Sequence, residues 1–194
     1  NRKIIVTGHT GFKGSWLSLW LKTYNAKILG ISMDVPTKPS HYNLIGLKSM
    51  INEKKIDIRN LEKLRKTITN FKPDIIFHLA AQAIVSKSYE NPIDTISSNL
   101  NGTANILESV RSLKNKCTVI MITSDKCYEN RETNIAYKET DNLGGDDIYS
   151  SSKAAAEITI KAYYRSFIRH NKNISIGIGR AGNVIGGGDW AQNR

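Results

Sequence analysis

Cysteine, histidine and proline are all scarce in this chain of 194 residues, which contains two, four and four of them. Two thiols, Cys117 and Cys127, cannot build a disulfide framework, so we expect small buried side chains and a reducing compartment, the cytoplasm. The four histidines are scattered without the paired spacing of a metal site, and no bound metal is expected. There is no apolar run long enough to cross a bilayer and no signal peptide, which argues against a membrane role.

Acidic residues are also few, because 28 Lys and Arg face 17 Asp and Glu and give a net charge of +11. The basic residues are spread along the chain and are densest around 52–65 and 161–172. A solvated surface explains this pattern best, attraction of phosphorylated small molecules second, and nucleic acid third. We therefore expect no nucleic-acid partner.

Short apolar segments alternate with helical patterns along the whole chain. Strands are expected over 3–7, 27–33, 55–58, 74–79, 118–123 and 174–179, and helices over 15–24, 61–71, 91–113 and 149–171. Such alternation is typical of βαβ units and a parallel sheet. The sequence therefore predicts an α/β fold, a Rossmann-type doubly wound parallel sheet with helices on both faces.

A glycine-rich turn follows the first predicted strand and opens the first predicted helix. Its glycines, Gly8, Gly11 and Gly14, would allow a tight turn and the close approach of a pyrophosphate to the helix N-terminus. Phe12 and Lys13 complete this candidate nucleotide site. The alternative is that the glycines only punctuate a strand-to-helix connection.

Asp34 lies about 20 residues beyond the turn, where a carboxylate can accept hydrogen bonds from an adenosine ribose. An anion there would repel a 2′-phosphate, so NAD is favoured over NADP. The alternative is a solvated turn residue before Pro36. Small residues after the fourth predicted strand, Ala80 and Ala81, would let a flat cofactor lie close to the backbone, or simply pack tightly.

The fifth predicted strand runs into Ser124, Asp125 and Lys126, and the last long helix opens with Tyr149 and Lys153. Residues four apart share one face of a helix. A free phenol ionises near pH ~10, and a cation beside it favours the phenolate, so this pair can act as a base on a hydroxyl that Ser124 holds. The alternative is an exposed Tyr and Lys. The irregular segment 127–148 is long enough to be a substrate lid.

These motifs occur in a recognisable order. VTGHTGFKGSWL, HLAAQ, TSDKCYENRE, YSSSKAAAE and RAGNVIGGGDWA resemble the CDP-glucose 4,6-dehydratases, a nucleotide-sugar branch of the extended short-chain dehydrogenase/reductase superfamily. The resemblance implies NAD as cofactor, CDP-glucose as nucleotide-sugar substrate, CDP-4-keto-6-deoxyglucose as product, and a homo-oligomer at full length. Residues 1–180 would form the NAD-binding domain, and 181–194 would begin the segment that leads to an absent substrate-binding domain, so the chain is expected to be a fragment.

The same resemblance assigns roles to individual residues. Tyr149 would help to oxidise C4 of the sugar, Lys126 or a neighbour would remove the C5 proton, and Asp125 would protonate the departing C6 hydroxyl. Further cofactor contacts would come from Asp57, Ile58, Leu79, Ala80, Ala81, Gln82, Ser98, Tyr149 and Lys153, and substrate contacts from Ser124, Asn183 and Arg194.

Two alternatives remain at this stage. A nucleotide-sugar 4-epimerase or reductase would need Ser124, Tyr149 and Lys153 but not Asp125 and Lys126. An NAD-binding sensor or interaction protein would need none of the five for catalysis.

Overall fold

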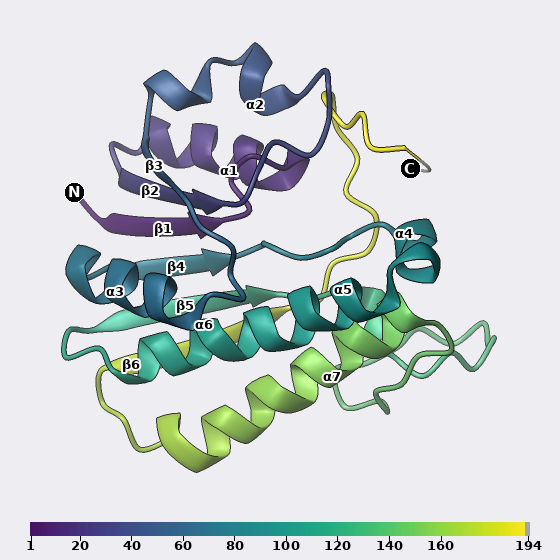
Figure 1. Cartoon of the computed structure of the whole chain (residues 1–194). Coiled ribbons are helices and arrows are strands. Elements are labelled where there is room, and N and C mark those ends of the chain that lie inside the picture. The colour runs from purple at the N-terminus through teal and green to yellow at the C-terminus, as the bar shows by residue number, and fades with distance from the viewer. Residues whose placement is uncertain (193–194) are drawn as a thin grey trace.

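The computed structural model describes residues 1–192 and contains a six-stranded parallel sheet with helices on both faces (Figure 1). The strands are β1 (Lys3–Thr7), β2 (Lys27–Ser32), β3 (Asn52–Lys55), β4 (Ile75–His78), β5 (Cys117–Ile122) and β6 (Ile174–Gly179). Their order is β3-β2-β1-β4-β5-β6, and every neighbouring pair is parallel. The winding reverses between β1 and β4, which is where ligands bind in such sheets. The predicted fold class is confirmed.

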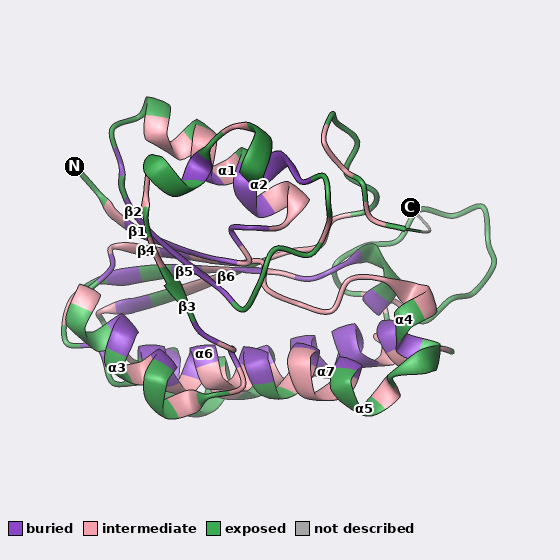
Figure 2. Ribbon diagram, turned by 45° about the horizontal axis from the view of Figure 1, so that its top comes forward, coloured by how far each residue is buried: buried purple, intermediate pink, exposed green. Residues whose placement is uncertain are grey.

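Two groups of helices sandwich the sheet (Figure 2). One face carries α1 (Phe12–Thr23) and the short α2 (His41–Leu44), and the other carries α3 (Leu61–Phe71), α6 (Gly102–Arg111) and α7 (Ile148–Tyr163). The short helices α4 (Val85–Glu90) and α5 (Pro92–Ile96) lie beyond the carboxyl end of β4. The carboxyl edge of the sheet is thus flanked by helices on both sides.

The apolar core is divided by the sheet into two unequal parts. The larger part lies under α3, α6 and α7 and includes Ile5, Leu64, Leu107, Val119 and Ile160, each at most 1% exposed. The smaller part joins Ile4, Val6, Ala26 and Ile28 to the partly buried Leu17 and Leu21 of α1. Because each fully buried aliphatic side chain contributes about 1.5–3 kcal/mol, the three-helix face contributes most of the stability.

The first helix packs differently from its apolar pattern. Trp16 and Trp20 lie at helical spacing among its apolar residues, yet they are 45% and 62% exposed. Gly14, Ser15 and Ser18 are the buried positions of α1. Small residues at the interface let the helix axis lie close to β1, which leaves the large indoles at its outer side.

The third strand lies three residues earlier than expected, over Asn52–Lys55 instead of 55–58. It is the edge of the sheet and pairs only with β2 among the described residues. An edge strand tolerates charged and polar residues, and lysine there discourages pairing with other chains. Asp57 and Ile58 therefore follow the strand instead of lying in it.

Both long helices contain a π-helical turn. The expected helix over 91–113 is α5, a π-helical turn at Ser97–Asn101 and then α6, and α7 ends in a second one at Tyr164–Ile168. On the last helix the apolar residues Ile158, Ala162 and Phe167 are exposed. The buried face of α7 instead contains Tyr149, Lys153, Ala156, Glu157 and Ile160.

Two irregular segments frame the carboxyl edge of the sheet. Residues 128–147 contain a single isolated bridge, Tyr128 to Leu143, as expected for a long loop. After β6, the chain runs back across the edge toward α1 and α2 (Figure 1). There the Trp16 indole donates to the Gly187 carbonyl at 2.9 Å. Within 1–192, no helix has the length and apolar character needed to span a membrane.

Candidate active site

The glycine turn after β1 is shaped by contacts between backbone atoms. Gly8 has φ +74°, and a Cβ on Gly14 would lie 2.1 Å from the Gly8 carbonyl oxygen. A Cβ on Gly11 would meet only that oxygen, at 3.4 Å. The packing of the chain therefore explains why Gly8 and Gly14 must lack a side chain, but it gives no such reason for Gly11. A missing side chain at Gly11 leaves room for a bound group to approach the backbone.

The start of α1 is suited to an anion. Gly11 is its N-cap and supplies no side-chain acceptor, and the first turn, with Phe12 and Lys13, has no acidic residue. The first N–H groups of a helix and its dipole attract negative charge. This arrangement fits the diphosphate of a dinucleotide.

A buried hydrogen-bond chain fixes the backbone after β4 beside this turn. The Thr7 hydroxyl accepts the N–H groups of Leu79 and Ala80, each at 3.2 Å. The same hydroxyl donates a hydrogen bond to Nδ1 of His78 at 2.8 Å. Nε2 of the ring therefore carries the proton and donates to the Thr103 hydroxyl. Burial lowers the pKa of His78 to about 3, aided by the charge of Lys153, and the ring is neutral.

Gln82 is held by the π-helical turn. The buried Asn99 side chain accepts the Gln82 N–H at 2.8 Å and donates to its carbonyl at 3.0 Å and to Ser152 of α7 at 2.9 Å. Ser98 lies on the same turn and is partly buried. Asn99 thus joins the end of β4 to α7, a role that its sequence position alone does not indicate.

Tyr149 and Lys153 lie on the inner face of α7 and are 8% and 7% exposed. Asp147 caps this helix by accepting the Ser150 N–H at 2.9 Å. The Lys153 ammonium is 6.0 Å from the centre of the Tyr149 ring. Burial, and then the positive charge of Lys13, lowers the pKa of Lys153 to about 8. The exposed-pair alternative is therefore wrong, and Lys13 from the glycine turn acts on the same ammonium.

Ser124, Asp125 and Lys126 leave β5 in a short 3-10 turn that packs against α7. Ser124 is buried; its hydroxyl accepts the Lys126 N–H at 3.2 Å and donates to the Asp125 carboxylate at 3.1 Å. The side chains of Asp125 and Lys126 are exposed. The structure thus brings Tyr149 and Lys153 of α7 and the polar residues 124–126 to one edge of the sheet.

Glu157 and Arg180 are the residues that the sequence patterns missed. Glu157 is fully buried on α7, and its carboxylate pairs with Arg180 just after β6 at 2.5 Å. It also accepts the Thr123 hydroxyl at 2.6 Å and the Cys127 thiol. The available signal was its spacing, because Glu157 is one helical turn beyond Lys153 and shares its face.

The other predicted residues are more dispersed. Asp34 is exposed just beyond β2, next to the glycine turn, and its carbonyl accepts the Thr10 hydroxyl at 2.5 Å.

The Asp57 carboxylate is held by the Arg59 guanidinium, which lowers its pKa. Ile58 is buried against Gly102 of α6. Asn183 is exposed in the segment after β6. Arg194 lies outside the described residues.

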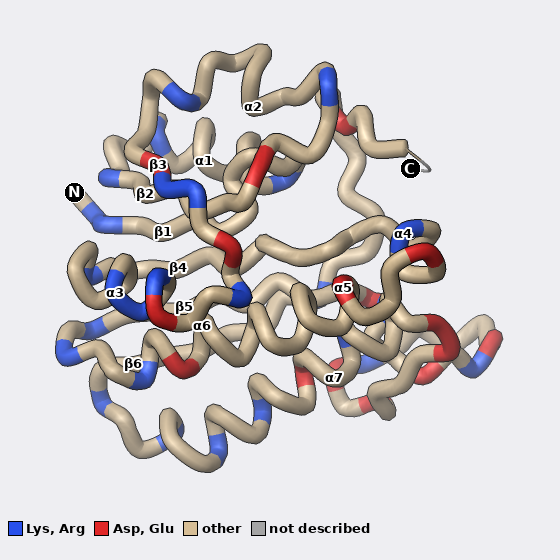
Figure 3. The backbone as a smooth tube through the Cα atoms, in the orientation of Figure 1, with Lys and Arg blue, Asp and Glu red and all other residues tan. Residues whose placement is uncertain are grey.

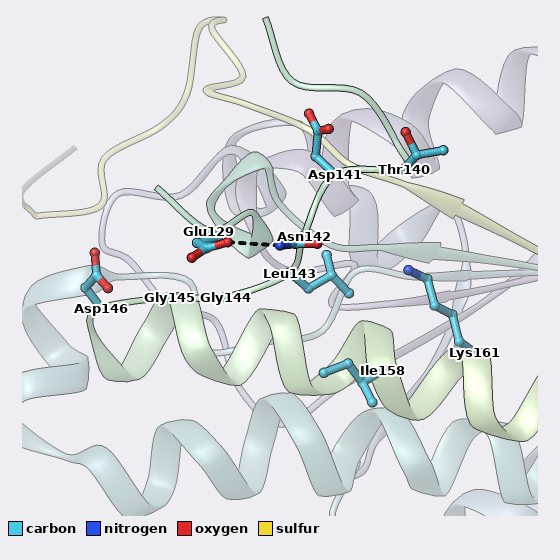
Figure 4. A pocket seen from close by; sticks show the side chains of 10 residues that line it. All are labelled: Glu129, Thr140, Asp141, Asn142, Leu143, Gly144, Gly145, Asp146, Ile158 and Lys161. Carbon is cyan, nitrogen blue, oxygen red and sulfur yellow. Dashed lines mark hydrogen bonds between the residues drawn. The ribbon is translucent and has the colours of Figure 1, made fainter. Parts of the chain in front are cut away.

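A separate hollow of about 650 Å³ lies between the 128–147 segment and the outer side of α7 (Figure 4). Its lining includes Glu129, Asp141 and Asp146, with Lys161 at its edge. Acidic residues are concentrated in this segment, whereas Lys and Arg are distributed over many elements (Figure 3). An anionic nucleotide would be repelled here, so the hollow is not the dinucleotide site.

The chain is similar to known nucleotide-sugar enzymes. It is 49% identical to a CDP-glucose 4,6-dehydratase from Salmonella typhimurium over 100% of this chain and 55% of that protein. It is 32% identical to a dTDP-D-glucose 4,6-dehydratase from Dictyostelium discoideum over 95% and 44%. Among solved structures, the UDP-glucuronic acid 4-epimerase from Bacillus cereus, in complex with UDP-glucuronic acid and NAD, has a TM-score of 0.75, 26% identity and coverage of 92% and 55%.

The chain thus spans about half the length of the curated relatives it matches. The likeness to a CDP-glucose 4,6-dehydratase confirms the resemblance expected from the motifs. The model of one family, described as GDP-mannose 4,6 dehydratase, matches residues 5–179. That match runs from within β1 to the end of β6 and includes α7. The chain belongs to the GDP-mannose 4,6-dehydratase family.

Proposed function

We propose that this chain holds the cofactor-binding and catalytic residues of an NAD-dependent CDP-glucose 4,6-dehydratase. The observation that supports it most is the meeting of a buried Tyr149–Lys153 pair with Ser124, Asp125 and Lys126 at one sheet edge. The 49% identity to a CDP-glucose 4,6-dehydratase supports the substrate class.

The cofactor site is proposed along the carboxyl ends of β1, β2 and β4. Gly8, Gly11, Phe12, Lys13 and Gly14 would hold the diphosphate at the start of α1. Asp34 would accept bonds from the ribose, and the backbone from Asp57 to Ile58 and from Leu79 to Gln82, with Ser98, would line the remainder. NAD, when bound, would take a hydride from C4 of the sugar and return it to C6.

The residues of α7 would serve the oxidation step. Tyr149 would take the proton of the C4 hydroxyl, which Ser124 would hold in place. Because the pKa of Lys153 is about 8, its ammonium is mostly protonated at pH 7 and favours the Tyr149 phenolate. The neutral His78 behind the pair adds no competing charge.

The residues after β5 would serve the elimination step. A ketone at C4 acidifies the C5 proton, and Lys126 or a neighbour would remove it. Asp125 would give a proton to the C6 hydroxyl as water leaves. Both residues are exposed at the carboxyl edge of the sheet. Asn183 would contact the substrate diphosphate, and Arg194 would add to it.

The experiment uses the protein expressed from its full open reading frame. Incubation with CDP-, dTDP-, UDP- and GDP-hexoses, followed by mass spectrometry, should give a 4-keto-6-deoxy product from CDP-glucose. Asp125→Asn and Lys126→Ala should abolish the loss of water and spare C4 oxidation. A 4-epimerase would tolerate both changes and release an isomer of unchanged mass. An NAD-binding protein without catalysis would give no product at all. We also propose that the full-length protein works in the cytoplasm as a homo-oligomer.

A further inference from the structure

One buried carboxylate collects donors from three elements next to the candidate site. Oε1 of Glu157 accepts the Thr123 hydroxyl at 2.6 Å, Nε of Arg180 at 2.8 Å and the Cys127 thiol at 3.2 Å. Oε2 accepts Nη2 of Arg180 at 2.5 Å. Glu157 is 0% exposed and the Arg180 side chain is 11% exposed, so this is a buried ion pair within a closed hydrogen-bond network.

The two donors from the β5 end bracket the three polar residues of the strand end. Thr123 precedes Ser124, Asp125 and Lys126, and Cys127 follows them. A single acceptor atom on α7 therefore fixes both ends of that stretch. The backbone continues the connection to β6, since Thr123 N–H donates to the Gly179 carbonyl at 2.9 Å and Asp125 N–H to the Ala181 carbonyl at 3.1 Å.

The network needs its negative charge. Burial by itself raises the pKa of the Glu157 carboxyl, but the bonds from Arg180, Thr123 and Cys127 together bring it below its usual value. A buried charge that loses its partner is strongly destabilising. The carboxylate is thus held ionised by the same donors that it positions.

Arg180 also holds the segment that follows the strand end. Its guanidinium lies 4.5 Å above the Tyr128 ring, and Nη1 donates to the Glu139 carbonyl at 3.3 Å. Tyr128 in turn stacks on Tyr137, with ring centres 4.9 Å apart. The irregular segment 128–147 is therefore tied to the end of β6 through this one cation.

The pair that would carry out the oxidation is positioned by other contacts. Tyr149 and Lys153 lie on the first turns of α7, which Asp147 caps and which Asn99 holds through Ser152. Neither contact involves Glu157. Loss of the Glu157 charge should therefore disturb residues 123–127 more than Tyr149 and Lys153.

We propose that Glu157 and Arg180 are positioning residues for the elimination step, which hold Asp125 and Lys126 in place without touching the substrate. This inference rests on the proposed dehydratase function. It predicts that the two halves of the reaction respond differently to a change at Glu157.

The test is Glu157→Gln in the full-length protein, which keeps the size of the side chain and removes its charge. In single turnovers with CDP-glucose, the rise of absorbance at 340 nm follows C4 oxidation, and its decay follows hydride return after elimination. We expect the decay to slow by about tenfold or more, equivalent to ~1.4 kcal/mol. The rise should slow by less than about threefold, because Ser124 lies on the stretch that Glu157 holds whereas Tyr149 and Lys153 do not. Equal slowing of both phases, or slowing of neither, would overturn the proposal.

Two further variants keep the outcome decisive. Glu108→Gln removes a carboxylate that pairs with Arg65 and Arg111 on α3 and α6, away from the site, and should change neither phase. If Glu157→Gln does not fold, Thr123→Val decides, since it removes one donor and keeps the ion pair. It should slow the decay by a smaller factor than Glu157→Gln does, and slow the decay more than the rise. Equal slowing of the rise and the decay in this variant would overturn the proposal. Absence of a 4-keto-6-deoxy product from the unmodified protein would instead refute the proposed function.

Discussion

Two stretches lie at the same edge of the sheet but are held by different kinds of interaction. The glycine turn between β1 and α1 is fixed by contacts of backbone on backbone, with a Gly14 Cβ excluded by the Gly8 carbonyl. The strand end from Thr123 to Cys127 is fixed by side chains that converge on the charge of Glu157. The first should therefore be sensitive to added volume, and the second to lost hydrogen bonds and charge.

The largest effect is expected in the glycine turn. In Gly14→Ala, the new Cβ would lie 2.1 Å from the Gly8 oxygen and 2.8 Å from Cα of His9, both backbone atoms that cannot move independently. The free energy of unfolding should fall by roughly 3 kcal/mol, at the upper end of overpacking costs, as measured by urea denaturation. Gly187→Ala is the control, because its Cβ would meet nothing within 4 Å. Similar urea midpoints for the two variants would show that the turn can shift to accommodate the new methyl group.

A smaller effect is expected at the strand end. Thr123→Val keeps the volume but removes the hydroxyl that donates to Glu157, so a buried carboxylate loses one of its bonds. The unfolding free energy should fall by roughly 1–2 kcal/mol. Thr118→Val on the same strand alters an exposed side chain and should change stability by less than about 0.5 kcal/mol. If the two valine variants were equally stable, the strand end would not depend on its side-chain bonds.

The pKa of Lys153 depends on the glycine turn, since the charge of Lys13 lowers it. Burial has the largest effect and brings the folded value to about 8, from 10.5. Between these values the unfolded chain binds more protons than the folded one, so this lysine makes stability rise with pH in that window and fall as pH drops through 8.

The expected rise is about 1 kcal/mol between pH 8 and pH 9, relative to Lys153→Met. Urea denaturation at the two pH values measures it, and the difference between proteins cancels the titration of other groups. Lys161→Met, an exposed position of the same helix, should rise in parallel with the unmodified protein. A parallel rise in Lys153→Met as well would mean that the buried ammonium titrates as it does in water.

Local chemistry made much of this arrangement predictable. The glycine turn after an apolar strand, and Tyr149 and Lys153 one helical turn apart, are each visible within a few residues of sequence, and both lie at the expected edge of the sheet. The order of strands and helices then determined the fold class. Each of these signals depends on residues that are close to one another in the sequence.

The features that were missed depend on contacts between distant residues. Glu157 is paired in the core with Arg180, which directly follows β6, and helical spacing around Glu157 cannot reveal that partner. The strand Asn52–Lys55 has a polar sequence that only its edge position permits. Trp16 and Trp20 are exposed because the close contact of α1 with the sheet is made by smaller residues.

The π-helical turn at Ser97–Asn101 also sets the rotational phase of the residues on either side of it. In an unbroken α-helix, Ile93 and Leu107 would lie within about 40° of each other around the axis. The extra residue in the wide turn offsets them by ~100° more, to about 140°. Ile93 is accordingly 76% exposed while Leu107 is 0% exposed. Deleting one residue of the turn would therefore rotate α5, and the Gln82 contact of Asn99 with it, out of alignment with the core beneath α6.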